Sequence, residues 1–331
     1  QVIERNNTLS IKYDFAKERK KPSGLLSLWV ADMDFPVAQE IKDALIERCN
    51  HGIFGYSEVK TPYYEVIAKW YQEKFNWSTK KQWLVKTPGV VAAIANAIRA
   101  FTNIGDAVLI QKPVYYPFFL TIEDNQRKVV NNSLVYKNGR YEMDFVDFEE
   151  KIISHKVKLF VLCSPHNPVG RVWNKEELLK IGDICLKHKV IVVADEIHAD
   201  FVYHGHQHQV FANLKTDYQE ITVTCTAPSK TFNIAGLQVS NIFIANENLR
   251  KKFKQELKKT ANADINVMGL IACQAAYSQG EDWLRQVKIY IAENLEYVKN
   301  FLRDNLPQVK LVEPEGTYLL WLDFRELNLT E

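Results

Sequence analysis

Three polar side chains in this chain, Lys230, Asp195 and Asn167, each follow a run of apolar residues that has the composition of a buried strand. The carboxyl ends of parallel strands meet at one edge of an α/β sheet, where ligands bind. We therefore expect these three side chains to lie close together. A lysine amine held in such a place can form a Schiff base with a carbonyl compound.

Asp195 gives the sharpest of these signals, because its carboxylate ends a run of five apolar residues. Burying a carboxylate is costly unless a positive group pairs with it. A protonated heterocyclic nitrogen of a ligand would pair with Asp195 and keep both groups charged. The alternative is an ion pair with a cation of the protein, with Glu196 as the solvent-facing neighbour.

Lys230 and Asn167 have weaker signals when each is taken alone. A lysine in a turn is usually solvated, so Lys230 gains weight only from its partners. Asn167 lies between two prolines. An amide held there could orient a ring hydroxyl or a carboxylate, and it is equally consistent with an ordinary turn residue.

A candidate phosphate site precedes the helix expected at 90–101. Gly89 opens this helix, so the free N–H groups of Val90 and Val91 could bind a phosphate with the help of the helix dipole. A plain Pro-Gly turn is the alternative, and no glycine fingerprint of a nucleotide site lies nearby. Tyr115 follows the next expected strand and could stack on a flat ring, or it could belong to the core.

Several histidines follow Asp195. His198 could hydrogen-bond a ligand or Asp195, although a single histidine is more often structural. His204, His206 and His208 alternate, so a strand would place them on one face as a metal site. Gly205 favours a loop, and neither carboxylates nor cysteines frame the run, so we predict no metal.

The elements that would position these residues alternate between helices and short apolar strands. This alternation predicts an α/β fold, with a three-layer α/β/α large domain around a mainly parallel sheet. Asn174 and Glu177 predict a capping box at the start of one helix. The expected helices are 37–50, 62–75, 90–101, 145–153, 174–188 and 283–306, and the expected strands of the sheet are 107–111, 157–163, 190–194, 221–225 and 239–245.

We expect three parts along the chain. Residues 1–45 form an N-terminal arm and part of a small domain, residues 46–275 form the large domain, and residues 276–331 form a small α+β domain. The last part should contain strands at 309–312 and 317–324. We expect both ends to be incomplete, because the sequence starts with Gln1 and stops at Glu331.

The composition of the 331-residue chain limits the classes of function. Its net charge of +2 gives no strong electrostatic footprint for nucleic acid or for an anionic membrane. No apolar run approaches the roughly 20 residues that span a bilayer, and no secretory signal opens the chain. The five cysteines are scattered and mostly lie in apolar runs, which predicts reduced thiols in a cytoplasmic protein.

Five motifs, taken together and in order, resemble the fold-type I pyridoxal-phosphate enzymes of the aminotransferase class I/II superfamily. The resemblance runs from about residue 27 to 324. Three further segments are similar to its cystathionine β-lyase or C–S lyase branch: Leu28-Trp-Val-Ala-Asp-Met-Asp-Phe-Pro36, Phe54-Gly-Tyr-Ser57 and Asp195-Glu-Ile-His198. The five superfamily motifs are Thr87-Pro-Gly-Val-Val91, Pro113-Val-Tyr115, Pro165-His-Asn-Pro-Val-Gly170, Ala194-Asp-Glu-Ile-His198 and Ser229-Lys-Thr-Phe-Asn-Ile-Ala-Gly236.

The resemblance implies a role for each matching residue around pyridoxal 5′-phosphate. Lys230 would be the Schiff-base lysine and the base that takes the substrate's Cα proton, and Asp195 would pair with the pyridinium nitrogen. Asn167 would bond the ring hydroxyl, with His198 nearby, and Tyr115 would stack on the ring. The remaining roles are phosphate binding by Val90, Val91 and Ser229, phosphate binding in the neighbouring subunit by Tyr56, and contact with the substrate carboxylate by Ala31.

The implied enzyme is a carbon–sulfur β-lyase that cleaves a sulfur amino acid to a thiol, pyruvate and ammonia, and works as a homodimer whose sites are completed across the interface. Two features depart from the wider family. Gln238 stands where many aminotransferases carry a phosphate-binding arginine. The family's carboxylate-binding arginine lies beyond the last strand-like segment, so no residue is assigned to it.

Three other functions stay open at this point. An aminotransferase would use the same cofactor and share the first steps of the reaction. A non-catalytic relative could act as a regulator or binding protein, and a metal-binding protein could use His204, His206 and His208.

Overall fold

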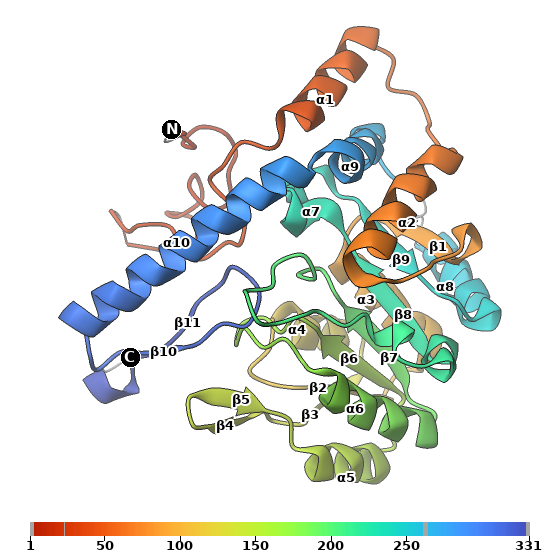
Figure 1. The fold of residues 1–331 in the computed structure, drawn as a ribbon. Helices are drawn as coiled ribbons and strands as arrows, with labels where there is room; N and C mark the ends of the chain where they lie inside the picture. Colours follow the sequence, from red (N-terminus) through yellow and green to blue (C-terminus); the bar gives the residue numbers. More distant parts are fainter. Residues whose placement is uncertain (1–2, 23, 261–263, 329–331) are drawn as a thin grey trace.

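A seven-stranded sheet forms the centre of the molecule (Figure 1). The structure is a computed structural model, which describes residues 3–22, 24–260 and 264–328. Of the seven strands only β9 runs against the others, so the sheet is mainly parallel, as predicted. In spatial order the strands are β1 (Leu84–Thr87), β9 (Ser240–Phe243), β8 (Thr222–Thr226), β7 (Ile191–Asp195), β6 (Leu159–Cys163), β2 (Ala107–Ile110) and β3 (Lys128–Asn131).

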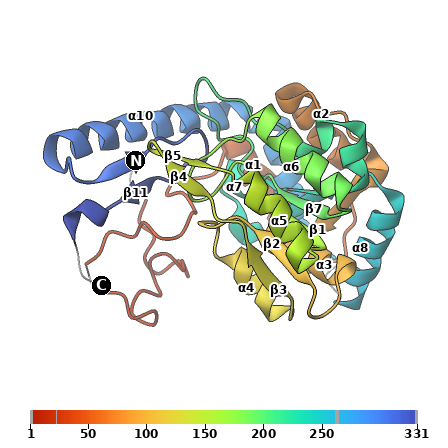
Figure 2. The ribbon, with the colours of Figure 1, turned by 90° about the horizontal axis from the view of Figure 1, so that it is seen from below.

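Both faces of this sheet are covered by helices, because successive residues of the central strands point into two different cores. Val161 of β6 packs in one core, whereas Phe160 and Leu162 pack in the other. The first core lies under α3 (Val90–Phe101), α4 (Pro117–Asp124) and α8 (Glu247–Lys259), and the second lies under α5 (Phe145–His155) and α6 (Lys175–Lys187). Figure 2 shows α5 and α6 on the side of the sheet opposite α3 and α4. The predicted three-layer α/β/α arrangement is therefore confirmed.

A third core lies beside the sheet, where α1 (Gln39–His51), α2 (Thr61–Phe75) and α9 (Val267–Gln279) meet. Trp70 of α2 stands edge-on to Phe232 and Tyr277, with ring centroids 5.5 Å away in each case. Phe232 directly follows the short helix α7 (Pro228–Thr231), which carries Lys230. This aromatic cluster therefore supports the segment that holds the candidate lysine.

The C-terminal elements lie outside the sheet. The long helix α10 (Glu281–Asn305) crosses the molecule, and β10 (Lys310–Val312) pairs with β11 (Trp321–Asp323) beneath it (Figure 1). A separate hairpin consists of β4 (Val135–Lys137) and β5 (Arg140–Glu142). Within the described residues, no helix is both long and apolar enough to cross a membrane.

The structure bears out most of the expected elements and corrects a few. Helix 90–101 has the predicted bounds, and Asn174 forms the predicted capping box with Glu177. The strand expected at 317–324 is reduced to β11, because the N–H of Thr317 donates to Phe201 rather than to a neighbouring strand. Strands β1 and β3 were not expected. They are the two edges of the sheet, where residues need less apolar character than in the centre.

Candidate active site

Asp195 ends strand β7 with its carboxylate buried, and within the described residues no cation lies at ion-pair distance from it. Its Oδ1 accepts a hydrogen bond from the N–H of Ile197 at 3.1 Å. Burial raises the pKa of Asp195 to about 7, although this hydrogen bond and the positive charge of Lys230 act in the other direction. The geometry therefore does not support the alternative of an ion pair within the protein, and the carboxylate is available to a positive group of a ligand.

Lys230 lies in α7, directly after the buried strand β8. Its amine has no hydrogen bond or ion pair within the part of the chain that the structure describes. Burial lowers the pKa of Lys230, whereas the carboxylates of Asp32 and Asp195 oppose that change. The next residue, Thr231, donates a hydrogen bond to the buried carboxylate of Asp200 at 2.7 Å, which fixes α7 in place. Helix α7 therefore holds Lys230 in place, and burial favours the neutral, nucleophilic form of its amine.

Asn167 and Tyr115 follow two other strands of the sheet, β6 and β2, and contact each other. The backbone N–H of Tyr115 donates to the carbonyl of Asn167 at 3.0 Å, and the N–H of Asn167 donates to the sulfur of Cys163 at 3.3 Å. Burial raises the pKa of Tyr115 to about 12, and the nearby charge of Asp195 adds to this shift. The Tyr115 ring therefore lies within electrostatic range of Asp195, as the sequence predicted for residues at one sheet edge.

His198 is buried on the same side, and the structure gives it no hydrogen bond to Asp195. Its Nδ1 has no partner within the described residues, and burial, aided by Lys230, lowers its pKa to about 3. Its ring stands edge-on to Tyr318, with centroids 5.7 Å apart. The hydroxyl of Tyr318 in turn donates to the carbonyl of Ala31 at 2.6 Å, which brings Ala31 to the site.

The N-terminus of α3 begins at Gly89 without a capping side chain within the described residues. A Cβ at Gly89 would meet no atom within 4 Å, so the space in front of this helix end is open. The free N–H groups of Val90 and Val91 are therefore available to an anion. Ser229 is the second residue of α7, and Gln238 is exposed in a left-handed conformation after this helix.

Tyr56 lies outside the sheet and makes no side-chain hydrogen bond to a described residue. It lies on the coil between α1 and α2, and its side chain is fully exposed. The coil also exposes Ile53 and Phe54. Tyr56 could therefore act only on a second molecule, which is the role that the sequence predicts for it.

Comparison with known proteins finds the family that the sequence motifs resemble, over nearly the whole chain. The family model described as aminotransferase class I and II matches residues 23–331. Cystathionine β-lyase PatB of Bacillus subtilis is 44% identical over 99% of this chain and 85% of its own. The chain belongs to the aminotransferase class I and II family.

Two solved structures of the family resemble this one closely. Cystalysin from Treponema denticola, whose crystal structure contains pyridoxal 5′-phosphate, has a TM-score of 0.95 and 38% identity, over 99% of this chain and 84% of its own. The PLP-bound C–S lyase from Staphylococcus hominis has a TM-score of 0.94 and 34% identity, over 100% of this chain and 84% of its own.

The residues of this member of the family suit the cofactor that those relatives contain. Within the described residues Asp195 and Lys230 have no ion-pair partner, so the buried carboxylate of Asp195 suits a positively charged ring nitrogen and the amine of Lys230 suits an aldehyde. The uncapped N-terminus of α3 suits a phosphate, and the partly buried ring of Tyr115 suits a flat heterocycle.

The structure corrects the expectation for Glu196 and shows where the histidines after it lie. Glu196 does not face solvent: it is buried, accepts a hydrogen bond from the N–H of Phe211 at 2.9 Å, and lies 3.1 Å from Nε2 of His208. The loop that follows β7 folds back over Glu196 and covers it. His204 and His206 are exposed beside the turn at Gly205, and the described residues contain no group of three or more side chains suited to hold a metal ion.

Sequence reasoning missed the loop that closes the site near Ala31. Asp32, Asn233 and Tyr318 make its contacts, and each belongs to an irregular segment with no periodic pattern. Asp32 and Asn233 lie within segments whose resemblance to the family was noted, so the signal available was a charged or amide residue inside such a motif.

Proposed function

We propose that this protein is a pyridoxal-phosphate-dependent carbon–sulfur β-lyase, which cleaves a sulfur amino acid to a thiol, pyruvate and ammonia. The observation that carries the proposal is the 44% identity to a cystathionine β-lyase over 99% of the chain. Lys230 and Asp195, which have no ion pair within the described residues, support it independently. Bound pyridoxal phosphate supplies an aldehyde that bonds to an amine and a ring that withdraws electrons from the attached carbon.

Lys230 would hold the cofactor through Nζ and, as a free amine, would take the proton from the substrate's Cα. Burial favours the neutral amine that this step needs. Asp195 keeps the ring nitrogen protonated, and Asn167, His198 and Tyr115 orient the ring. The Cβ–S bond then breaks, and its electron pair leaves with sulfur as a thiolate. The remaining three-carbon fragment is hydrolysed to pyruvate and ammonia.

Phosphate binding in this proposal uses the N–H groups of Val90 and Val91 together with Ser229. The exposed Gln238 takes no part in it. Ala31 contacts the substrate carboxylate, because its carbonyl is fixed by Tyr318 beside His198. These assignments come from the family resemblance.

A homodimer is part of the proposal, with Tyr56 binding the phosphate of the neighbouring subunit. Two exposed apolar side chains on the same coil as Tyr56, Ile53 and Phe54, support an interface there. Mixing inactive Tyr56→Ala and Lys230→Ala chains should restore about a quarter of wild-type activity, because random pairing gives one intact site per mixed dimer. No recovery after subunit exchange would contradict shared sites.

The proposal also keeps the predicted division of the chain. Residues 46–275 bind the cofactor, and residues 1–45 and 276–331 form the arm and the smaller domain. A cytoplasmic location is proposed as well, since the five cysteines are free thiols and four of them are buried.

Lys230→Ala tests the function directly. The variant should release no measurable pyruvate from cystathionine, cystine or cysteine, whereas Lys69→Ala, which changes an exposed lysine, should match the wild type. Pyruvate release by Lys230→Ala at the wild-type rate would contradict the proposal. Turnover of a keto acid by the wild type without any pyruvate would instead favour the aminotransferase.

A further inference from the structure

The loop Ala31–Phe35 is fixed directly to the segment that carries Lys230. Asn233, three residues after Lys230, donates from Nδ2 to the carbonyls of Met33 and Phe35, both at 2.9 Å. Its Oδ1 accepts from the N–H of Met33 at 2.9 Å. The hydroxyl of Tyr318 holds the carbonyl of Ala31 at 2.6 Å. Asp32 therefore lies between Ala31, which is hydrogen-bonded to Tyr318, and Met33, which is hydrogen-bonded to Asn233.

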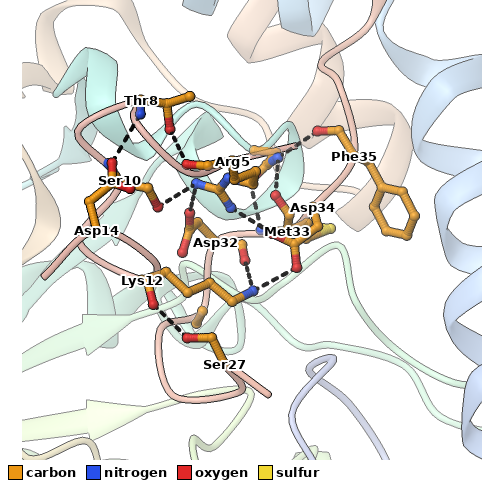
Figure 3. A network of polar contacts seen from close by, with 12 residues as sticks. Arg5, Thr8, Ser10, Lys12, Asp14, Ser27, Asp32, Met33, Asp34 and Phe35 are labelled. Atoms are coloured by element: carbon orange, nitrogen blue, oxygen red, sulfur yellow. Dashed lines mark hydrogen bonds and ion pairs between the residues drawn. The ribbon is translucent and has the colours of Figure 1, made fainter. Parts of the chain in front are cut away.

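The two carboxylates of this loop differ in how completely they are paired (Figure 3). Asp34 uses both oxygens, one with Arg5 at 2.7 Å and the other with Lys12 at 2.8 Å. Asp32 uses only Oδ2, which lies 2.5 Å from Arg5. Its Oδ1 is buried and has no partner within the described residues.

The unpaired oxygen belongs to a carboxylate that acts on Lys230. Asp32 and Asp195 both favour the protonated amine of Lys230. Burial, aided by the charge of Lys230, lowers the pKa of His198 to about 3, so this histidine carries no charge at neutral pH. Burial also raises the pKa of Tyr318, to which Asp32 contributes, so the tyrosine stays neutral.

We propose that Asp32 is a positioning residue for Lys230: Arg5 holds one of its oxygens, and the other oxygen stabilises and orients the charged amine of Lys230. The inference rests on the proposed function, in which Lys230 gains a proton from the substrate's Cα. Asp195 is then occupied by the ring nitrogen, so Asp32 is the carboxylate that remains for the new ammonium group. In this step the proton stays on Nζ, because Asp32 stabilises the charge and accepts no proton.

The test measures the Lys230 amine in the full chain after its cofactor has been removed. Acetic anhydride acetylates only neutral amines, so the rate of Lys230 acetylation against pH, followed by mass spectrometry, gives the pKa of Lys230. The exposed Lys69 serves as the internal standard. Asp32→Asn should lower the pKa of Lys230 by about one unit. Acetylation below that pKa then becomes roughly tenfold faster.

Two further variants separate this electrostatic role from loosening of the loop. Asp34→Asn breaks ion pairs with the same Arg5, and it should leave the pKa of Lys230 unchanged. Arg5→Gln should raise the pKa of Lys230, because Asp32 then acts without its competing cation. Opposite signs for Asp32→Asn and Arg5→Gln support the proposal, since a loosened loop would shift both variants in one direction.

The proposal is overturned if Asp32→Asn leaves the pKa of Lys230 unchanged, or if Asp34→Asn shifts it equally. Should Asp32→Asn fail to fold, the sign of the Arg5→Gln shift decides. The visible absorption band of the cofactor-loaded wild type tests the binding of the cofactor separately. If the cofactor band appears but Asp32→Asn does not change the pKa of Lys230, only this inference is contradicted. If Asp32→Asn changes that pKa but the wild type shows no cofactor band, the proposed function is contradicted.

Discussion

The two carboxylates that act on Lys230 come from two different kinds of structure. Asp195 ends a central strand of the sheet, where neighbouring strands and two cores fix it, and no cation of the described part of the chain pairs with it. Asp32 lies in a loop, and Arg5 of the N-terminal arm pairs with it. In the sheet, the packing of a large core can offset the free-energy cost of a buried carboxylate that has no ion pair. A loop has no such core, so its carboxylate comes with its own counter-ion.

The largest difference between these two carboxylates should appear in the pH dependence of stability without cofactor. Burial raises the folded-state pKa of Asp195 to about 7, from an ordinary value of 3.8. The stability that Asp195 contributes is therefore fully present below about pH 4 and is lost as pH rises through 7. Relative to Asp195→Asn, the wild type should lose at most about 4 kcal/mol of unfolding free energy over that window. Urea unfolding at a series of pH values measures this.

Asp32→Asn serves as the comparison for that experiment, because Asp32 has a protein cation. Relative to Asp32→Asn, the wild type should show no such loss of unfolding free energy between pH 4 and 7. If the difference in unfolding free energy between wild type and Asp195→Asn stays constant from pH 4 to 7, ionisation of Asp195 does not destabilise the folded protein.

Catalysis should be the next most sensitive property. Asp195→Asn should lower kcat/KM for β-elimination by roughly 10²–10³-fold, the size typical of removing one preorganised electrostatic partner. The reason is that a neutral amide no longer keeps the ring nitrogen protonated. Steady-state pyruvate release measures the loss, and the cofactor absorption band confirms that the variant is loaded. A loss below about threefold would remove Asp195 from the mechanism.

A smaller effect is expected where the loop joins the sheet segment. Asn233→Ala removes three hydrogen bonds to the Ala31–Phe35 loop. We expect the unfolding free energy to fall by about 2 kcal/mol, given roughly 1 kcal/mol per bond and partial exposure. Asn138→Ala is the matched control, since Asn138 is also left-handed but exposed. Equal losses in the two variants would show that backbone conformation alone accounts for the change.

The same contrast explains what could be predicted from the sequence. Lys230, Asp195 and Asn167 follow apolar strands, and parallel strands bring their ends together by a general rule. The edge strands β1 and β3 were missed because lysines such as Lys86 and Lys128 break their apolar runs. The burial of Glu196 was missed because it depends on a loop that folds back over it. The loop around Asp32 is placed by contacts of its neighbours Met33 and Ala31 with Asn233 and Tyr318, which are 200 or more positions away and which no local pattern encodes.

One measurement tests the central claim most directly. The cofactor-loaded protein is reduced with borohydride, which makes the bond between cofactor and protein permanent, and peptide mass spectrometry then locates the attached group. The account predicts a single modified lysine, Lys230, and no attachment in Lys230→Ala. Attachment at a different lysine of the wild type, or no attachment at all, would contradict it.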